Sequence, residues 1–113
     1  MAHVRICKTK EVPPGDLKEF NPHKHSILVV NVDGKFHCLS ARCTHAGAPL
    51  ASGIVRGEEL QCPWHGNLFR ISDGSLIFAG MGPEEPLKVY PCEVKGAYLY
   101  VDIPEDKSVS NRK

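Results

Sequence analysis

Residues 26–41 read SILVVNVDGKFHCLSA, the stretch of this chain that is most typical of a β-hairpin. Ser26–Asp33 is rich in β-branched residues and apolar on both faces, as a strand covered on both sides would be. Asp33-Gly34 follows, and glycine accepts the positive φ that a tight primed turn requires. Lys35–Ala41 then supplies the second strand. The pattern predicts two antiparallel strands joined by a two-residue turn.

The rest of the chain predicts more strands and no helix. Val4–Cys7 is expected to be the first strand, and the Pro-Pro-Gly-Asp sequence that ends Glu11–Asp16 is expected to form a turn. Three further hairpins are expected, at Gly53–Gln61, at Asn67–Phe78 across Asp73-Gly74, and at Leu87–Ile103 across Lys95-Gly96. No apolar stripe with a 3.6-residue period reaches helical length. The fold class predicted from the sequence is therefore all-β.

Length and charge narrow the classes of function. A chain of 113 residues is the size of one domain, and we expect that domain to span residues 1–103, with a polar tail over residues 104–113. The formal net charge of +1 gives no electrostatic reason to expect nucleic acid or an anionic membrane as a partner. Ile27–Val30, the longest apolar run, is too short to span a bilayer. Because the first residues contain no secretory signal, a cytoplasmic location is expected.

Cysteine and histidine are unusually frequent, with five and six copies. An odd number of cysteines argues against a fully paired disulfide framework and favours metal binding. Two loops at predicted strand ends read CTHAGAPL (43–50) and CPWHG (62–66), which gives the pattern Cys-x-His, a spacer, then Cys-x-x-His. The candidate ligands are Cys43, His45, Cys62 and His65. Turn-forming residues surround both pairs, namely Gly47, Pro49, Pro63 and Gly66.

Two kinds of metal site are compatible with these four residues. A structural zinc site would use all four in tetrahedral geometry, and the protein would then be an interaction module. The single residue between Cys43 and His45 is shorter than the usual spacing of zinc ligands. In a two-iron cluster both cysteines bind one iron and both histidines bind the other. The Cys-x-His spacing suits the cluster better, since the two side chains of one loop then reach different irons.

The boxes CTHAGAPL and CPWHG resemble those of the Rieske 2Fe-2S proteins. The similarity extends more weakly over GIVRGEELQ (53–61), NLFRISDGS (67–75) and YPCEVKGAYLYVDI (90–103). It implies a Rieske fold, in which an antiparallel β-sandwich base carries a small cluster-binding subdomain, here about residues 42–78, with two ligand loops. It also implies one 2Fe-2S cluster, with Cys43 and Cys62 on the buried iron and His45 and His65 on the outer iron. Residues 80–83 fall where the family has a third loop over the cluster, which contains Pro83.

The chain departs from the high-potential Rieske proteins of cytochrome bc-type complexes. Those proteins join the two loops by a disulfide, at positions that correspond to Ala48 and Trp64. They also place a Ser and a Tyr hydroxyl against the sulfur atoms, at positions that correspond to Asn67 and Phe69. Because hydrogen bonds to these sulfurs raise the reduction potential, we expect the lower end of the Rieske range, about −150 mV rather than about +300 mV. The chain resembles the soluble Rieske-type ferredoxins.

That resemblance implies an electron-transfer protein rather than an enzyme. A monomeric carrier would accept an electron from an NAD(P)H-dependent flavoprotein reductase and deliver it to an oxygenase or another redox partner. The partner is expected to dock over His45 and His65. The residues expected around the cluster or on the docking rim are Ala46, Gly47, Ala48, Pro49, Trp64, Gly66, Asn67, Phe69 and Pro83. For Trp64, packing of its own loop is an equally good interpretation.

Two other functions are considered. The small Rieske-like subunit of an assimilatory nitrite reductase is similar in size, although many such subunits lack the ligands that are present here. A self-contained oxygenase would need a mononuclear iron held by two histidines and a carboxylate. We do not expect His3, His23, His25 and His37 to form such a site, because residues 23–25 are predicted to lie in an exposed turn.

The remaining cysteines and one acidic stretch have simpler interpretations. Cys7, Cys38 and Cys92 lie in predicted strands, where small buried thiols are common and need no function. Residues 82–86 contain two glutamates and are expected to form a solvated loop. An acidic docking edge for a basic reductase is the alternative for that stretch.

Overall fold

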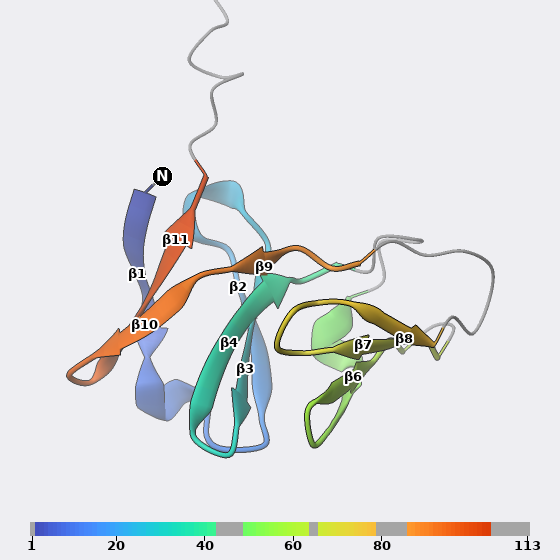
Figure 1. Cartoon of the computed structure of the whole chain (residues 1–113). Coiled ribbons are helices and arrows are strands. Elements are labelled where there is room, and N and C mark those ends of the chain that lie inside the picture. Colours follow the sequence, from blue (N-terminus) through green and yellow to red (C-terminus); the bar gives the residue numbers. More distant parts are fainter. Residues whose placement is uncertain (1, 43–48, 64–65, 79–85, 105–113) are drawn as a thin grey trace, which may run out of the picture.

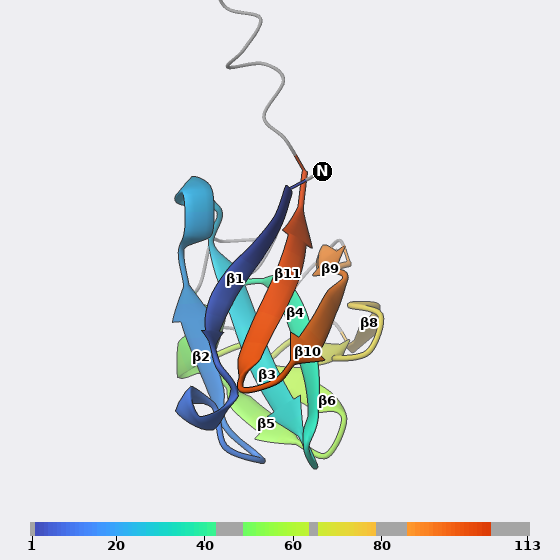
Figure 2. The same cartoon turned by 90° about the vertical axis from the view of Figure 1, so that its left-hand side faces the viewer.

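The computed structural model describes residues 2–42, 49–63, 66–78 and 86–104. These residues form three antiparallel sheets, shown in Figures 1 and 2, and three short 3-10 helices. The 3-10 helices are η1 (Thr9–Glu11), η2 (Pro22–Lys24) and η3 (Leu50–Ser52). The prediction of an all-β chain is confirmed.

Two of the sheets form the base of the fold. The first has the order β1-β11-β10 and the second has the order β2-β3-β4-β9. The strands of the first sheet are β1 (Ala2–Lys8), β11 (Tyr98–Ile103) and β10 (Cys92–Lys95). The strands of the second sheet are β2 (Leu17–Phe20), β3 (Ile27–Val32), β4 (Lys35–Ser40) and β9 (Val89–Tyr90).

The hairpin predicted over residues 26–41 is confirmed as β3 and β4, which pair from Ile27 with Ser40 to Val32 with Lys35. Its turn has φ of 52° at Asp33 and 92° at Gly34, the two positive values of a primed turn. All four residues of Ile27–Val30 are fully buried. The strand therefore lies inside the fold, as its two apolar faces predict.

The two faces of β3 belong to two different hydrophobic cores. Leu28 and Val30 lie in the core that also contains Phe69, here called the Phe69 core. Ile27 and Val29 lie in the core that also contains Cys38, here called the Cys38 core. Side chains of a strand alternate between its faces, so the second sheet has one core on each side. The first sheet covers the Cys38 core, and the third sheet covers the Phe69 core.

The third sheet contains the segment expected to bind the metal. Its order is β5-β6-β7-β8, over Ile54–Arg56, Glu59–Gln61, Leu68–Arg70 and Leu76–Phe78. The hairpins predicted at Gly53–Gln61 and Asn67–Phe78 are confirmed as β5-β6 and β7-β8. Figure 1 shows this small sheet beside the second sheet of the base. All four strands lie within residues 54–78, one continuous part of the chain.

The fourth predicted hairpin is shorter than expected, because only β10 and β11 form it. Val89 and Tyr90 pair with β4 instead, in the second sheet. Proline has no amide hydrogen and interrupts a ladder, so Pro91 separates the two pairings. Its carbonyl accepts a hydrogen bond from the Asp102 amide at 2.8 Å. The chain thus passes from the second sheet to the first at Pro91.

The alternation predicted for the last strand is confirmed. Leu99, Val101 and Ile103 are buried, whereas the residues between them are partly exposed. Strand β2 was not predicted from the sequence; it is only four residues long and pairs with β3 at the sheet edge. Within the described residues, no helix is long and apolar enough to cross a bilayer.

Candidate metal centre

The first ligand loop is anchored at both of its ends. Arg42 and Pro49, which flank residues 43–48, form an isolated antiparallel bridge. The Leu50 amide donates a hydrogen bond to the Ala41 carbonyl at 2.9 Å. Leu50 and Ala41 are fully buried in the Phe69 core. The two ends of this segment are therefore held side by side on the core.

The second ligand loop begins where β6 ends, at Cys62. The Cys62 amide donates to the Asn67 carbonyl at 2.8 Å, and the Gly66 amide donates to the Cys62 carbonyl at 3.3 Å. Gly66 has φ of 72°, in the left-handed region that glycine adopts without a side-chain clash. The turn predicted at Gly66 is thus part of a loop that closes on itself. Pro63 is exposed on that loop.

The Cys62 thiol is only 2% exposed and belongs to the Phe69 core. Iron–sulfur clusters are held by cysteine thiolates, and shielding from water is one of the factors that set their potential. A thiol at the start of a closed loop, shielded from water, fits a cluster ligand. Cys62, the proposed ligand that the structure describes, therefore suits an iron–sulfur centre.

The bases of the two ligand loops are in contact through Gly53 and Gln61. A Cβ atom added at Gly53 would lie 2.2 Å from the Gln61 carbonyl oxygen and 3.1 Å from that of Leu50. No side chain fits in that space, so glycine allows η3 to approach β6 directly before Cys62. The sequence analysis did not identify Gly53 as important. A glycine that follows a loop and opens a strand is a weak signal by itself.

Asn67 and Phe69 are both fully buried. Phe69 lies opposite Leu60 in the pairing of β6 with β7, and both side chains belong to the Phe69 core. Asn67 stands directly before β7, and its carbonyl closes the Cys62 loop. Both residues thus lie at the base of the second loop. Pro49 is half-buried at the end of the first loop.

Several predicted site residues lie outside the described residues. These are Cys43, His45, Ala46, Gly47, Ala48, Trp64, His65 and Pro83, together with the two glutamates of residues 82–86. Within the described ranges, no three His, Cys, Asp or Glu side chains come together as a possible metal site. This result leaves Cys62 as the one proposed ligand whose surroundings are described.

The other cysteines lie in strands, as predicted: Cys7 in β1, Cys38 in β4 and Cys92 in β10. Cys7 and Cys38 are buried, whereas Cys92 is half-buried. Burial, and secondarily the charge of Glu11, raises the pKa of Cys7 to about 11. That thiol is neutral at physiological pH.

The described histidines outside the ligand loops belong to three different elements: β1, β4 and the surroundings of η2. His3 contacts two carboxylates, with Nδ1 at 2.5 Å from Asp102 and Nε2 at 3.1 Å from Glu93. His23 is exposed and His25 half-buried around η2, in the turn expected there. His37 is half-buried on β4. They do not gather as a second iron site would require.

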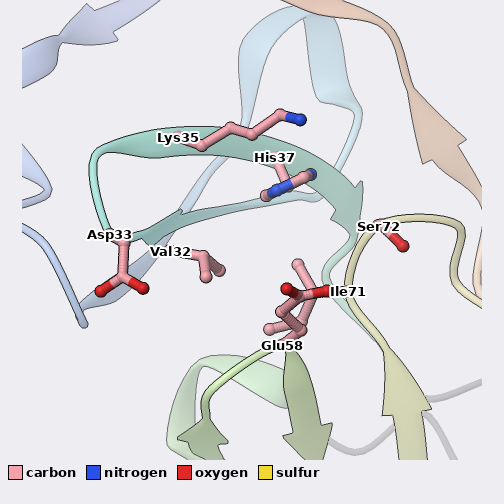
Figure 3. A pocket seen from close by; sticks show the side chains of 7 residues that line it. All are labelled: Val32, Asp33, Lys35, His37, Glu58, Ile71 and Ser72. Atoms are coloured by element: carbon pink, nitrogen blue, oxygen red, sulfur yellow. The ribbon is translucent and has the colours of Figure 1, made fainter.

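His37 lines a cavity of about 310 Å³ between the β3-β4 hairpin and the third sheet (Figure 3). Its lining is Val32, Asp33, Lys35, His37, Glu58, Ile71 and Ser72. Burial and the charge of Lys35 lower the pKa of His37, and the charge of Glu58 opposes them. Cys62, the proposed ligand that the structure describes, does not line this cavity. It results from the packing of two sheets and was not predicted from the sequence.

The chain is similar to known proteins in family, sequence and structure. The family described as the Rieske [2Fe-2S] domain matches residues 2–91. The biphenyl dioxygenase ferredoxin subunit of Pseudomonas sp. strain KKS102 is 32% identical over 103 residues, which cover 90% of this chain and 93% of that protein. Human apoptosis-inducing factor 3 is 38% identical over 97 residues, or 85% of this chain, but the match spans only 16% of that protein.

A solved structure gives the same result. It is described as a complex of reduced oxygenase and oxidised ferredoxin in carbazole 1,9a-dioxygenase. The matching chain is 29% identical and has a TM-score of 0.77. The alignment covers 88% of this chain and 91% of the matching chain. The arrangement of the sheets is therefore shared with a protein of solved structure.

Proposed function

This chain belongs to the Rieske [2Fe-2S] domain family, and from that premise we propose that it is a one-electron carrier. In this proposal it accepts electrons from an NAD(P)H-dependent flavoprotein reductase and passes them to an oxygenase or another redox partner. The family holds one 2Fe-2S cluster per domain. The observation that carries the proposal is the match to a ferredoxin subunit over 93% of that protein's length. Ferredoxin components are electron carriers and not catalytic enzymes.

We assign the cluster to Cys43, His45, Cys62 and His65, with the cysteines on one iron and the histidines on the other. The buried thiol of Cys62 and the closure of its loop support the assignment. The anchoring of Arg42 against Pro49 supports it for the first loop, because both loops then start from the same core. The domain in this proposal spans residues 1–103, and its cluster-binding subdomain spans about residues 42–78.

When it is bound, a Rieske cluster takes up and releases one electron, at a potential raised by its histidine ligands. The protein's part is to hold the ligands in place and to limit access of water. The backbone amide of Cys62 is held by its hydrogen bond to the Asn67 carbonyl, and the thiol of Cys62 belongs to the Phe69 core. His45 and His65 would present their free ring nitrogens to a partner and exchange a proton there.

The choice of partner follows from two relatives. One is named as a dioxygenase ferredoxin subunit, and the other is the ferredoxin of a complex with an oxygenase. We propose an oxygenase of this kind as the acceptor, docked over His45 and His65 on the rim that includes Ala46, Trp64 and Pro83. A monomeric carrier in the cytoplasm completes the proposal. Transient electron-transfer complexes have small interfaces. The net charge of +1 is therefore compatible with docking of this kind.

Anaerobic stopped-flow spectroscopy tests the carrier function. The protein is first reduced with NADH and a ferredoxin-type flavoprotein reductase, and is then mixed with an oxidised terminal oxygenase. We expect one electron per chain to be taken up and delivered. Cys62→Ser should lose the visible spectrum and the transfer, whereas Cys7→Ser, a buried cysteine outside the ligand set, should keep both. A Cys62→Ser protein that transfers electrons normally would contradict the assignment.

A further inference from the structure

Three cysteines outside the proposed ligand set meet in one part of the fold. Cys7 and Cys38 are members of the Cys38 core, and Cys92 packs against it. This core lies on the opposite face of the second sheet from the Phe69 core, which contains Cys62. The thiol chemistry considered below therefore does not depend on the cluster ligands.

Cys38 and Cys92 lie in the same part of the fold because the chain changes sheets at Pro91. Cys38 lies opposite Tyr90 in the pairing of β4 with β9, and Cys92 begins β10 just beyond. The Cys92 side chain packs against the core to which Cys38 belongs. The Cys92 thiol donates a hydrogen bond to the Phe36 carbonyl, with an S···O distance of 3.5 Å. Because Phe36 and Cys38 lie on the same strand, β4, this bond holds Cys92 against the strand that carries Cys38.

The two thiols differ in their access to solvent. Cys38 is fully buried, whereas Cys92 is half-buried and lines a surface depression. The other residues that line it are His3, Pro91, Glu93, Lys95 and Asp102. A small reagent in that depression reaches Cys92, and Cys38 stands behind it in the core.

The pKa values of the two thiols shift in opposite directions. The hydrogen bond from the Cys38 side chain is the largest effect that lowers the pKa of Cys92. The Cys38 amide adds to it, and burial and the Asp102 carboxylate oppose it. The pKa of Cys38 is raised by that hydrogen bond, by burial and by the charge of Cys92. Reactive cysteines are accessible thiolates, commonly beside a second thiol that resolves the oxidised form.

We propose that Cys92 and Cys38 form an oxidant-sensitive thiol pair, in which Cys92 reacts with a hydroperoxide and Cys38 then closes a disulfide. In the first step the Cys92 thiolate attacks one oxygen of hydrogen peroxide. An S–O bond forms, the O–O bond breaks and hydroxide leaves, which gives a sulfenic acid. In the second step the Cys38 sulfur attacks the Cys92 sulfur, and water leaves with the Cys38 proton. Hydroxide takes up the proton that Cys92 had released, so two thiols and one peroxide give one disulfide and two waters.

The disulfide would join β4 of the second sheet to β10 of the first. A dithiol reductant would restore the two thiols by disulfide exchange. The neighbouring Cys7 provides the comparison, since it lies in the same core but its thiol is buried and neutral. The inference goes beyond electron transfer and does not rest on the proposed partner.

Peptide mapping tests the pair directly, because trypsin places each cysteine in a separate peptide. Cys38 is in FHCLSAR (36–42), Cys92 is in VYPCEVK (89–95) and Cys7 is in ICK (6–8). The cluster-loaded protein is treated with hydrogen peroxide, free thiols are blocked by alkylation, and the unreduced digest is analysed by mass spectrometry. We expect FHCLSAR linked to VYPCEVK, with the link lost after treatment with a dithiol.

Three single substitutions give the controls. Cys38→Ser should stop the link and let a sulfenic acid accumulate at Cys92, where a 1,3-dione reagent traps it. Cys92→Ser should abolish both the link and the trapped product, while Cys7→Ser should change neither. In the unoxidised wild-type protein, alkylation of Cys92 should be about tenfold faster than that of Cys7 or more. Retention of the visible spectrum confirms that each variant is folded and loaded.

Two results would overturn the proposal. One is a folded, cluster-loaded protein in which peroxide leaves FHCLSAR and VYPCEVK unlinked. The other is a Cys92 thiol that reacts no faster than Cys7. A disulfide that involves only the peptides of Cys43 and Cys62 counts against the proposal as well, since it would report damage to the cluster site.

Discussion

The backbone amide of Cys62 donates a hydrogen bond to the carbonyl of Asn67, with an N···O distance of 2.8 Å. This bond closes the loop that carries two of the four proposed ligands, Cys62 and His65. Strand β6 ends directly before this loop and β7 begins directly after it, so the loop is the connection of an antiparallel pair. The position of Cys62 is thus set by the pairing of two strands.

Gly53→Ala should weaken the metal site through a steric clash. The added Cβ would lie 2.2 Å from the Gln61 carbonyl oxygen, so η3 and β6 would have to move apart at the base of both ligand loops. Overpacking of this kind costs about 1–3 kcal/mol. We expect a lower iron content per chain and a lower unfolding midpoint.

Gly15→Ala is the control for that experiment. A Cβ at Gly15 meets nothing within 4 Å, although its φ of 85° is strained for alanine. We expect a loss of about 1 kcal/mol in stability with unchanged iron content. Equal iron loss in both variants would show that Gly53 has no special role at the site.

Phe69→Tyr should raise the reduction potential. Phe69 is fully buried in the core that contains Cys62, and it has no hydroxyl to donate. We expect the wild-type protein near the lower end of the Rieske range, about −150 mV, because hydrogen bonds to the sulfurs raise the potential. Protein-film voltammetry measures both proteins.

Phe36→Tyr makes the same chemical change in the Cys38 core, on the other face of the second sheet. Its potential should equal that of the wild type. The hydrogen-bond argument fails if the wild-type potential is well into the positive range, or if Phe69→Tyr produces no upward shift relative to Phe36→Tyr.

Asn31→Ala should destabilise the base without changing the potential. Asn31 is buried, and its side chain donates to the Val12 carbonyl at 2.8 Å and accepts from the Gly34 amide at 2.7 Å. Loss of both bonds leaves buried polar groups unpaired, at a cost of about 2 kcal/mol. Chemical denaturation should detect this cost, whereas the exposed Asn21→Ala should change stability by less than about 0.5 kcal/mol. A changed reduction potential in Asn31→Ala would contradict this prediction, because it would show that the turn between β3 and β4 influences the cluster.

His37 should make the stability depend on pH in the acidic range. Burial, followed by the charge of Lys35, lowers the pKa of His37 in the folded state. The unfolded chain then binds a proton more readily than the folded chain, so stability should fall as the pH drops below about 6.5. His37→Gln should reduce that fall, and denaturation midpoints of both proteins between pH 5 and pH 8 provide the test. Parallel midpoint curves would rule out a contribution from His37.

The sequence predicted the hairpins well because each has a local signal. Asp33-Gly34 adopts the two positive φ values of its turn, and the alternation of Tyr98–Ile103 matches the burial of that strand. The Cys-x-His and Cys-x-x-His boxes were also local signals, since their residue types and spacing indicate a metal site with cysteine and histidine ligands. Features that depend on local patterns were therefore predictable.

Features that depend on contacts between distant parts of the chain could not be predicted from the sequence. The pairing of Val89–Tyr90 with β4 is decided by the second sheet, and the interruption at Pro91 does not by itself reveal the new partner. The need for glycine at position 53 arises from the Gln61 carbonyl, eight residues away. The packing of Cys92 against the core that contains Cys38 likewise results from the change of sheets. None of these pairings leaves a signal within its own segment.

The central claim is that Cys43, His45, Cys62 and His65 hold a Rieske cluster. Electron paramagnetic resonance of the anaerobically reduced protein tests it most directly. We predict the rhombic signal of a cluster with two histidine ligands, with an average g-value below that of a four-cysteine cluster. A four-cysteine signal would contradict the account, as would a colourless protein that contains stoichiometric zinc.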